Sequence, residues 1–221
     1  MKTLKIKITN TSPLMLSSGD GEGTLIDSDV VWDNMGLPYF PARRLRGLLR
    51  ESALESIEMM EMSGLINKIS VSGVDSLFGK PGEEGKIRIY DLFLESYEAI
   101  QDWMGWLQKE GKNDFFSSEK IKNAITQIRQ QTAINREGIA LDNSLRTSRA
   151  LNKGFTFSGN LFVLAEEEKH TNLLSLACRN LRRAGLNRNR GFGEIEVKLF
   201  DWEKELTEDI LRSLKGVIAN V

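Results

Sequence analysis

A glycine-rich turn near the C-terminal end of the chain carries the residues best suited to phosphate binding. Gly185, Gly191 and Gly193 can adopt a positive φ and allow a polyanion to approach the backbone. Arg188 and Arg190 lie between them, and each guanidinium is a planar, cationic hydrogen-bond donor that matches a phosphate. Taken alone, the segment fits at least as well a helix that ends at Gly185, followed by a solvated turn. The rest of the chain must decide between these interpretations.

Aspartates are the second group with chemical potential, and they lie in a long loop over residues 12–39. This loop contains Asp20, Asp27, Asp29 and Asp33. Carboxylates can hold a divalent ion or accept a proton from a nucleophile. Aspartate also stabilises turns by bonding nearby backbone, and the residues alone favour this second interpretation.

Arginines are concentrated in a few parts of a chain that has almost no net charge. With 30 basic and 31 acidic residues, the formal net charge is −1, which argues against a general polycation that coats nucleic acid. Binding to nucleic acid must therefore come from local clusters, although a solvated helix face is the usual alternative. The clusters are Arg43, Arg44, Arg46 and Arg50; Arg146 and Arg149; and Arg179, Arg182, Arg183, Arg188 and Arg190.

Composition also indicates the cellular compartment in which the protein works. Cys178 is the only cysteine, which excludes an internal disulfide or a thiolate zinc site, and its apolar helical pattern predicts a buried thiol in a reducing cytoplasm. The sequence shows neither a signal peptide nor a bilayer-spanning run, so we expect a soluble cytoplasmic protein with no membrane partner. The only histidine, His170, is expected at the surface. Trp103 and Trp106 have helical spacing and are assigned to packing or a subunit contact.

The hydrophobic pattern predicts a chain that mixes strands and helices. Leu4, Ile6 and Ile8 alternate with polar residues, which predicts a strand over residues 2–9. The other predicted elements are a helix that starts near Pro41, a short strand or turn over 71–78, a strand over 86–94, a strand from Gly154 to Val163, a helix carrying Leu173, Leu174, Ala177 and Leu181, a strand over 195–199, and a last amphipathic helix with Leu206, Ile210, Leu211, Leu214 and Ile218.

Residues 96–152 give the least regular pattern. The pattern predicts one helix around Trp103 and Trp106, another around Ile121, Ile125 and Ile128, and then a polar link that bears arginines. The element order as a whole predicts a single α+β domain over residues 1–221, ferredoxin-like (RRM-like), with a large insertion at 96–152 and a C-terminal helix. Such a sheet is often a nucleic-acid platform, but the fold hosts many functions and fixes none of them.

Three separated segments resemble one known family. The first segment contains Ile26-Asp27-Ser28-Asp29-Val30-Val31-Trp32-Asp33, then Leu37-Pro38-Tyr39-Phe40-Pro41 and Leu45-Arg46-Gly47. The second contains Leu77-Phe78-Gly79 and Ile87-Arg88-Ile89-Tyr90-Asp91-Leu92-Phe93, and the third is the turn from Gly185 to Gly193. In order and spacing they resemble the RAMP superfamily, specifically the repeated backbone subunit of type III CRISPR effector complexes. The sequence departs from that pattern at Ala42-Arg43-Arg44, where small residues are usual, and at Asp29, where a proline is common.

The resemblance implies a subunit that binds guide RNA, meets target RNA, and assembles with other effector subunits and with further copies of itself. It implies RNA contacts from Arg43, Arg46, Arg50, Arg146, Arg188, Arg190, Gly191 and Gly193. It places Asp27 where the family has an aspartate that cleaves target RNA with a divalent ion, here expected to be Mg²⁺ held by Asp27. Asp29 is the second catalytic candidate, and Asp33 is assigned to the loop. Leu145 lies where the family has a projection that wedges between bases, with a polar loop as the alternative.

Other functions stay open at this point. A structural or guide-end-capping RAMP subunit would use the same aspartates only to shape the loop. A free-standing guide-processing endoribonuclease would cut precursor RNA alone and without metal. An RNA-independent scaffold is the last alternative.

Overall fold

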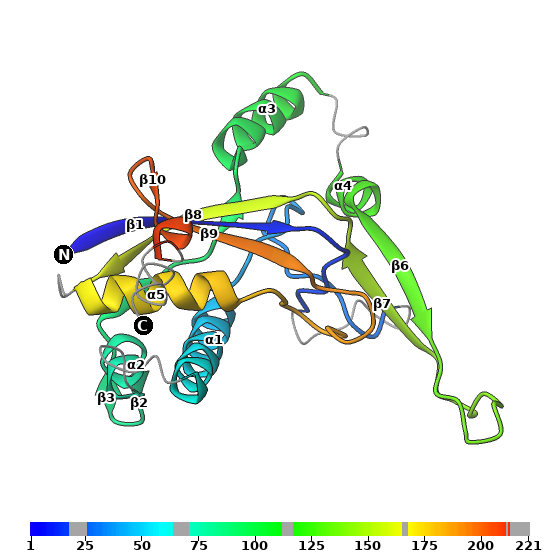
Figure 1. The fold of residues 1–221 in the computed structure, drawn as a ribbon. Helices are drawn as coiled ribbons and strands as arrows, with labels where there is room; N and C mark the ends of the chain where they lie inside the picture. The colour runs from blue at the N-terminus through cyan, green and yellow to red at the C-terminus, as the bar shows by residue number, and fades with distance from the viewer. Residues whose placement is uncertain (18–25, 64–70, 112–116, 165–167, 211, 213–221) are drawn as a thin grey trace.

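The computed structural model places three helices on one face of an antiparallel sheet, and a two-stranded hairpin projects from one end (Figure 1). It describes residues 1–17, 26–63, 71–111, 117–164, 168–210 and 212. The main sheet has the strand order β10-β9-β1-β8-β4, with β5 also paired to β8. Its strands are β1 (Lys2–Asn10), β4 (Ile87–Ile89), β5 (Phe93–Leu94), β8 (Thr156–Val163), β9 (Ile195–Asp201) and β10 (Lys204–Glu205).

The central strand β1 follows the predicted alternation. Leu4, Ile6 and Ile8 are at most 1% exposed and belong to the core beneath the sheet. Removing these apolar faces from water is the main stabilising term for such a layer. The predicted strand over residues 2–9 is confirmed, and so are the strands that flank it, β8 and β9.

Helices α1 (Ala42–Met62) and α5 (Glu168–Asn180) cover the sheet side by side (Figure 1). Pro41 is the N-cap residue of α1, one position before the first helical turn. The apolar stripe of α1 is buried, and Ser52 on the same stripe donates a 2.8 Å hydrogen bond from Oγ to the Ala177 carbonyl of α5. Both helices were predicted, because each has apolar residues at a spacing of three and four.

The segment over residues 71–78 was predicted as a short strand or turn, and this prediction is wrong. It forms helix α2 (Val71–Phe78), in which Val74, Leu77 and Phe78 are buried against the core. Their spacing of three and four is helical, but eight residues are too few for this period to stand out. A small hairpin, β2 (Gly79–Lys80) and β3 (Glu83–Glu84), follows α2.

The predicted strand over residues 86–94 is interrupted. Its two ends form β4 and β5, while Leu92 between them pairs with Phe40 instead. The Phe40 amide donates to the Leu92 carbonyl at 2.8 Å, and the Leu92 amide donates back at 2.9 Å. This exchange ties the start of α1 to the edge of the sheet.

Between β5 and β8 the chain forms α3 (Tyr97–Lys109), α4 (Ser118–Ile125), β6 (Thr126–Gln131) and β7 (Arg146–Leu151). The prediction of a helix around Trp103 and Trp106 is confirmed. The next predicted helix holds for Ile121 and Ile125, but Ile128 lies in β6. The predicted polar link is in fact the β6–β7 hairpin, which projects away from the sheet (Figure 1). The insertion boundaries of 96 and 152 stay a prediction.

Two further expectations concern α5. Cys178 is buried as predicted, and burial raises the pKa of its thiol far above the usual range. His170 is also fully buried, so its expected place at the surface is wrong. Its Nε2 lies 3.2 Å from Ser76 Oγ, because the first turn of α5 packs against α2.

The chain end is described only in part. Residues 206–210 are helical, which agrees with the start of the predicted last helix, whereas Leu211, Leu214 and Ile218 lie outside the described residues. None of the described helices is both long and apolar enough to cross a bilayer.

Candidate functional site

The aspartate loop is attached to the projecting hairpin along strand β7. Ser28 and Ser148 form a parallel β-bridge. The Asp27 amide donates to the Thr147 carbonyl at 2.9 Å, and the Arg149 amide donates to the Ser28 carbonyl at 3.0 Å. The loop is therefore joined to the edge of the hairpin by one β-bridge and its flanking backbone hydrogen bonds.

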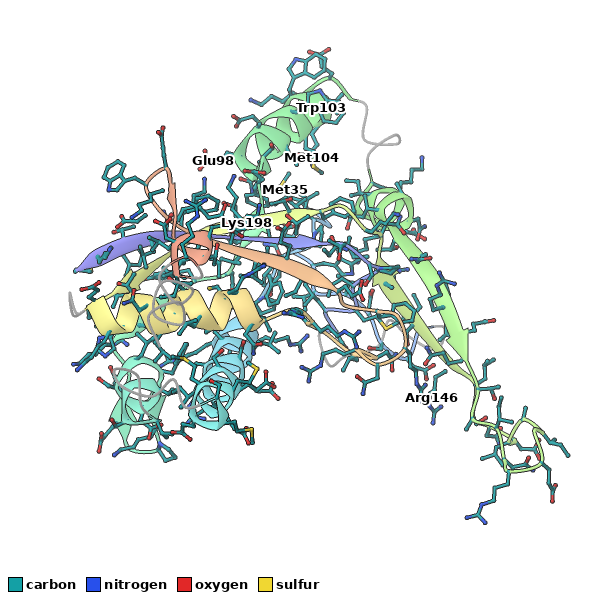
Figure 2. The ribbon with its side chains drawn as sticks, in the orientation of Figure 1. Met35, Glu98, Trp103, Met104, Arg146 and Lys198 are labelled. Atoms are coloured by element: carbon teal, nitrogen blue, oxygen red, sulfur yellow. The ribbon has the colours of Figure 1, made fainter. Side chains whose placement is uncertain are left out.

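The Asp27 carboxylate is half-exposed and lies beside the guanidinium of Arg146. Its Oδ2 accepts a 2.7 Å hydrogen bond from the Thr147 amide, and its Oδ1 lies 3.9 Å from Arg146 Nη1. The Asp27 side chain is 48% exposed and that of Arg146 is 66% exposed. Figure 2 shows Arg146 on the hairpin, far from the main sheet. One carboxylate oxygen and one guanidinium thus face an open surface together.

Asp29 is placed differently. Its side chain is 9% exposed, and its Oδ2 lies 3.3 Å from the equally buried guanidinium of Arg149. Its Oδ1 accepts a 2.7 Å hydrogen bond from the Val30 amide. The second catalytic candidate therefore faces the interior, in an ion pair between the loop and β7, and its predicted role in cleavage stays untested.

Asp33 performs the turn chemistry that was expected of it. Its Oδ1 accepts hydrogen bonds from the amides of Met35 at 2.9 Å and Leu37 at 2.8 Å. Its Oδ2 accepts a 2.6 Å hydrogen bond from the Tyr97 hydroxyl, at the start of α3. The fourth aspartate of the loop, Asp20, lies outside the described residues.

The Tyr97–Asp33 bond gives a testable pH dependence. Burial, together with the bond to the Asp33 carboxylate, raises the pKa of Tyr97 to about 12. Because the folded-state pKa is raised, this contribution to stability is fully present below pH 10 and is lost as the pH rises toward 12. We expect Tyr97→Phe to lower the free energy of unfolding by about 1–2 kcal/mol below that range.

Urea unfolding of wild type and Tyr97→Phe at several pH values checks this prediction. The gap between the two proteins should shrink as the pH rises through the range in which Tyr97 ionises. A gap that stays constant up to pH 12 would contradict the assignment.

The glycine-rich turn is packed tightly against residues 13–15. Gly193 has φ of +76°, and its amide donates a 2.8 Å hydrogen bond to the Pro13 carbonyl while its carbonyl accepts from the Ala184 amide at 2.8 Å. A Cβ at this position would lie 2.0 Å from the Ala184 carbonyl oxygen. Gly193 therefore serves the packing of the turn. Gly191 also has a positive φ, but it is exposed and a Cβ there would meet open space.

The two arginines of the turn are exposed. Together with Arg183, Asn187 and Asn189 they line a shallow hollow. Arg188 Nη1 lies 3.9 Å from Glu51 Oε2 of α1, and Arg190 Nη1 donates a 3.2 Å hydrogen bond to Gln131 Oε1 of β6.

The contact between Arg190 and Gln131 places the glycine-rich turn next to the hairpin to which the aspartate loop is joined. Gln131 lies directly opposite Arg146 in the β6–β7 register, so their side chains share one face of the hairpin. A row of polar residues therefore leads from Arg190, which bonds to Gln131, to the opposite strand at Arg146, which lies 3.9 Å from Asp27. We call these four residues the hairpin row. At one end of this row the Asp27 carboxylate, which could accept a proton, lies beside the Arg146 guanidinium, which could stabilise negative charge.

The arginines of α1 have partners within the fold. Arg46 Nε donates to the Phe78 carbonyl at 3.2 Å, and Arg50 pairs with Asp75 at 3.0 Å, so both hold α2 in place. Arg43 is exposed one turn earlier. The expectation that these residues contact RNA stays a prediction, and for Arg46 and Arg50 such contacts would compete with the bonds to α2.

Comparisons with known proteins decide the family. The sequence matches the RAMP superfamily over residues 7–196. The chain belongs to the RAMP superfamily. The predicted resemblance is thus confirmed, although no curated protein matches this RAMP sequence.

Among the solved structures that match this RAMP chain, two show the shared fold. A chain of the type III-B Cmr-beta complex bound to cognate target RNA superposes with a TM-score of 0.67 at 13% identity, over 95% of this chain and 99% of that one. A chain of Cmr-beta in its apo state gives a TM-score of 0.65 at 14% identity, over 95% and 98%. At these identities the likeness concerns the fold alone, and it confirms the predicted α+β class.

The predicted divalent ion can be tested against the residues present. Within the described ranges of this RAMP chain, no group of three His, Cys, Asp or Glu side chains is placed to hold a metal. Asp27 supplies a single half-exposed carboxylate. Magnesium commonly takes one or two carboxylates and completes its shell with phosphate oxygens and water. A single carboxylate is compatible with a divalent ion that is shared with RNA, and the predicted Mg²⁺ at Asp27 stays a prediction.

Proposed function

We propose that this chain is a guide-RNA-binding subunit of a type III CRISPR effector complex and that it cleaves guide-matched target RNA at Asp27. The observation that carries the proposal is the hairpin row, which joins the arginine turn to the aspartate loop. The RAMP family and the likeness to Cmr-beta chains, one of them from a complex bound to target RNA, support it. The strand order β9-β1-β8-β4, with helices on one face, also supports a ferredoxin-like core.

RNA is expected on the hairpin side of the molecule. Arg188 and Arg190 are exposed there. On the open face of the sheet, Lys7 pairs with Glu95, and Lys198 pairs with Glu196 at 3.3 Å, closer than the 3.9 Å between Arg188 and Glu51. Those lysines carry their own counter-charges. Contacts from arginines to phosphates position RNA without reading its sequence, which suits a subunit that must accept any guide.

The tip of the hairpin supports the wedge that the resemblance implies. Leu145 is 56% exposed, next to the start of β7, and Ile134, Ile139 and Leu141 are also exposed on the connection between β6 and β7. Exposed apolar side chains at the end of a projecting hairpin are unusual unless they meet a partner. We assign Leu145 to contact with unstacked bases beside the cleavage site.

The proposed chemistry uses the two exposed groups of the site, the Asp27 carboxylate and the Arg146 guanidinium. The Asp27 oxygen that faces Arg146 accepts the proton of the RNA 2′-hydroxyl, and the 2′-oxygen forms a bond to the adjacent phosphorus. The bond from phosphorus to the 5′-oxygen breaks, and that oxygen takes a proton from water. Arg146 stabilises the charge that builds on the phosphate oxygens. A bound divalent ion would add charge neutralisation at the same phosphate.

A second function is a non-catalytic backbone subunit. It is favoured by the 2.7 Å bond from the Thr147 amide to Asp27, which shows that this carboxylate already has a role in the loop. A free-standing guide-processing nuclease that uses histidine is disfavoured, because His170 is the only histidine and it is buried.

Salt-dependent RNA binding tests the guide-binding part of the proposal. We expect Arg188→Ala with Arg190→Ala to weaken binding of a guide-length RNA to the reconstituted complex, equally for unrelated sequences. The slope of log affinity against log salt should fall in magnitude by about 0.7 for each phosphate contact that is lost. Arg212→Ala is the matched control, because the Arg212 side chain is 79% exposed and far along the chain from the turn. An unchanged slope in the double variant would refute the assignment.

A further inference from the structure

The buried ion pair between Asp29 and Arg149 is the feature of this region that the proposed chemistry does not use. Both side chains are less than a tenth exposed, and Nη1 of Arg149 lies 3.3 Å from Oδ2 of Asp29. A buried pair of this kind contributes little net stability, because desolvation of the two charges offsets their attraction. Its best-attested use is to fix one register among several.

The position of Asp27 depends on how the aspartate loop is aligned with β7. Ser28 lies opposite Ser148, and the loop is joined to β7 by a few backbone bonds only, in a region rich in polar side chains. A slip by one residue would turn every side chain of the loop to the other face. It would also remove the 2.7 Å bond between the Thr147 amide and Asp27, and move Asp27 away from Arg146.

The observed register brings the two buried charges of Asp29 and Arg149 together. Asp29 and Arg149 are 120 positions apart in sequence, so their contact forms only when the loop is seated on β7. A shift of the loop along β7 would separate these two charges, and separating a buried ion pair costs much more than the loss of one surface contact. The pair therefore selects the alignment that brings the Asp27 carboxylate beside Arg146.

We propose that Arg149 is a positioning residue which, through Asp29, holds the Asp27 carboxylate in register with β7 and Arg146. The inference rests on the proposed function for its catalytic consequence, but the alignment itself is independent of any nuclease activity. The ion pair then joins the aspartate loop to the hairpin, so that RNA bound along the hairpin meets Asp27 in a fixed position.

Three variants of the reconstituted complex test this. Arg149→Met removes the guanidinium, and Arg149→Lys keeps the charge without the fork. Because Arg149→Met leaves a buried charge that can prevent folding, the double variant Asp29→Asn with Arg149→Met removes both charges and should fold. Asp201→Asn is the matched control, since it breaks an ion pair to Lys2 of 2.8 Å at the far end of the sheet.

Two readouts separate positioning from a general structural role. In single-turnover assays with saturating target RNA, the double variant should cleave about 10- to 100-fold more slowly than wild type, with an unchanged Kd for the target. Arg149→Lys should recover part of that loss, and Asp201→Asn should cleave at the wild-type rate. Amide hydrogen exchange in the RNA-free complex should rise at Asp27 and Arg149, whose amides bond across the junction.

The outcomes are distinct. If the folded double variant cleaves at the wild-type rate while Asp27→Ala does not cleave, the positioning role is wrong and the proposed function stands. If Asp27→Ala cleaves normally, the proposed nuclease function fails, whatever the double variant does. If exchange at the junction is unchanged in the double variant, the ion pair does not fix the register and the inference is overturned.

Discussion

Asp27→Ala should abolish the regularly spaced cuts that a reconstituted complex makes in a guide-matched, labelled RNA. The Asp27 carboxylate is the half-exposed member of the described loop aspartates, because Asp29 is buried and Asp33 is used by the turn and by Tyr97. Losing a positioned proton acceptor costs about 10²- to 10⁴-fold in rate. Guide loading and target affinity should change little, since most of the binding comes from arginines.

Asp27→Asn distinguishes a role of Asp27 in proton transfer from a role in holding the loop. An asparagine oxygen can still accept the 2.7 Å hydrogen bond from the Thr147 amide, but the side chain cannot take a proton at neutral pH. We therefore expect Asp27→Asn to assemble normally and to cleave as poorly as Asp27→Ala. Asp102→Ala, which removes an exposed carboxylate from α3, is the control for charge alone. Cleavage by Asp27→Asn at the wild-type rate would assign this residue to the loop only.

Gly193→Ala should be the most destabilising single substitution in the glycine-rich turn. The added Cβ would lie 2.0 Å from the Ala184 carbonyl oxygen, which is backbone and cannot rotate away, and φ is +76°. Left-handed strain of about 1–2 kcal/mol adds to overpacking of about 1–3 kcal/mol, so we expect a loss of roughly 3 kcal/mol or more. Thermal or urea unfolding measures this directly.

Gly191→Ala is the matched control for that substitution. Its φ of +79° is nearly the same, but a Cβ there meets no atom within 4 Å. Only the backbone strain applies, so the loss should be about 1–2 kcal/mol. Equal losses for the two variants would show that the packing of Gly193 against Ala184 is not what fixes the turn.

Elements with a clear apolar period could be predicted from the sequence, and elements without one could not. The alternation in β1 and the stripes of α1 and α5 reflect burial against a single core. In β6, by contrast, every side chain is intermediate or exposed, so Thr126–Gln131 carries no alternation that marks a strand. The hairpin is held by backbone pairing with β7 and by its neighbours, which leaves little trace in composition.

The sequence could predict the two motifs of the candidate site, but not that they lie close together. The aspartate loop and the arginine turn could be found by residue type and order. Their meeting depends on the contact between Arg190 and Gln131, 59 positions apart, and on the pairing of Asp29 with Arg149. Gln131 and Thr147 carry no chemical signal of their own, and they act through position on the hairpin.

The central claim is that RNA lies along the hairpin row, from the arginine turn to Asp27. Ultraviolet crosslinking of guide and target RNA in the reconstituted complex, followed by mass spectrometry of the crosslinked peptides, tests it most directly. The account predicts crosslinks in the Gly185–Gly193 turn, in residues 26–30 and in β7. Crosslinks confined to the open face of the sheet, around Lys5 and Lys198, with none on the turn or the hairpin, would contradict it.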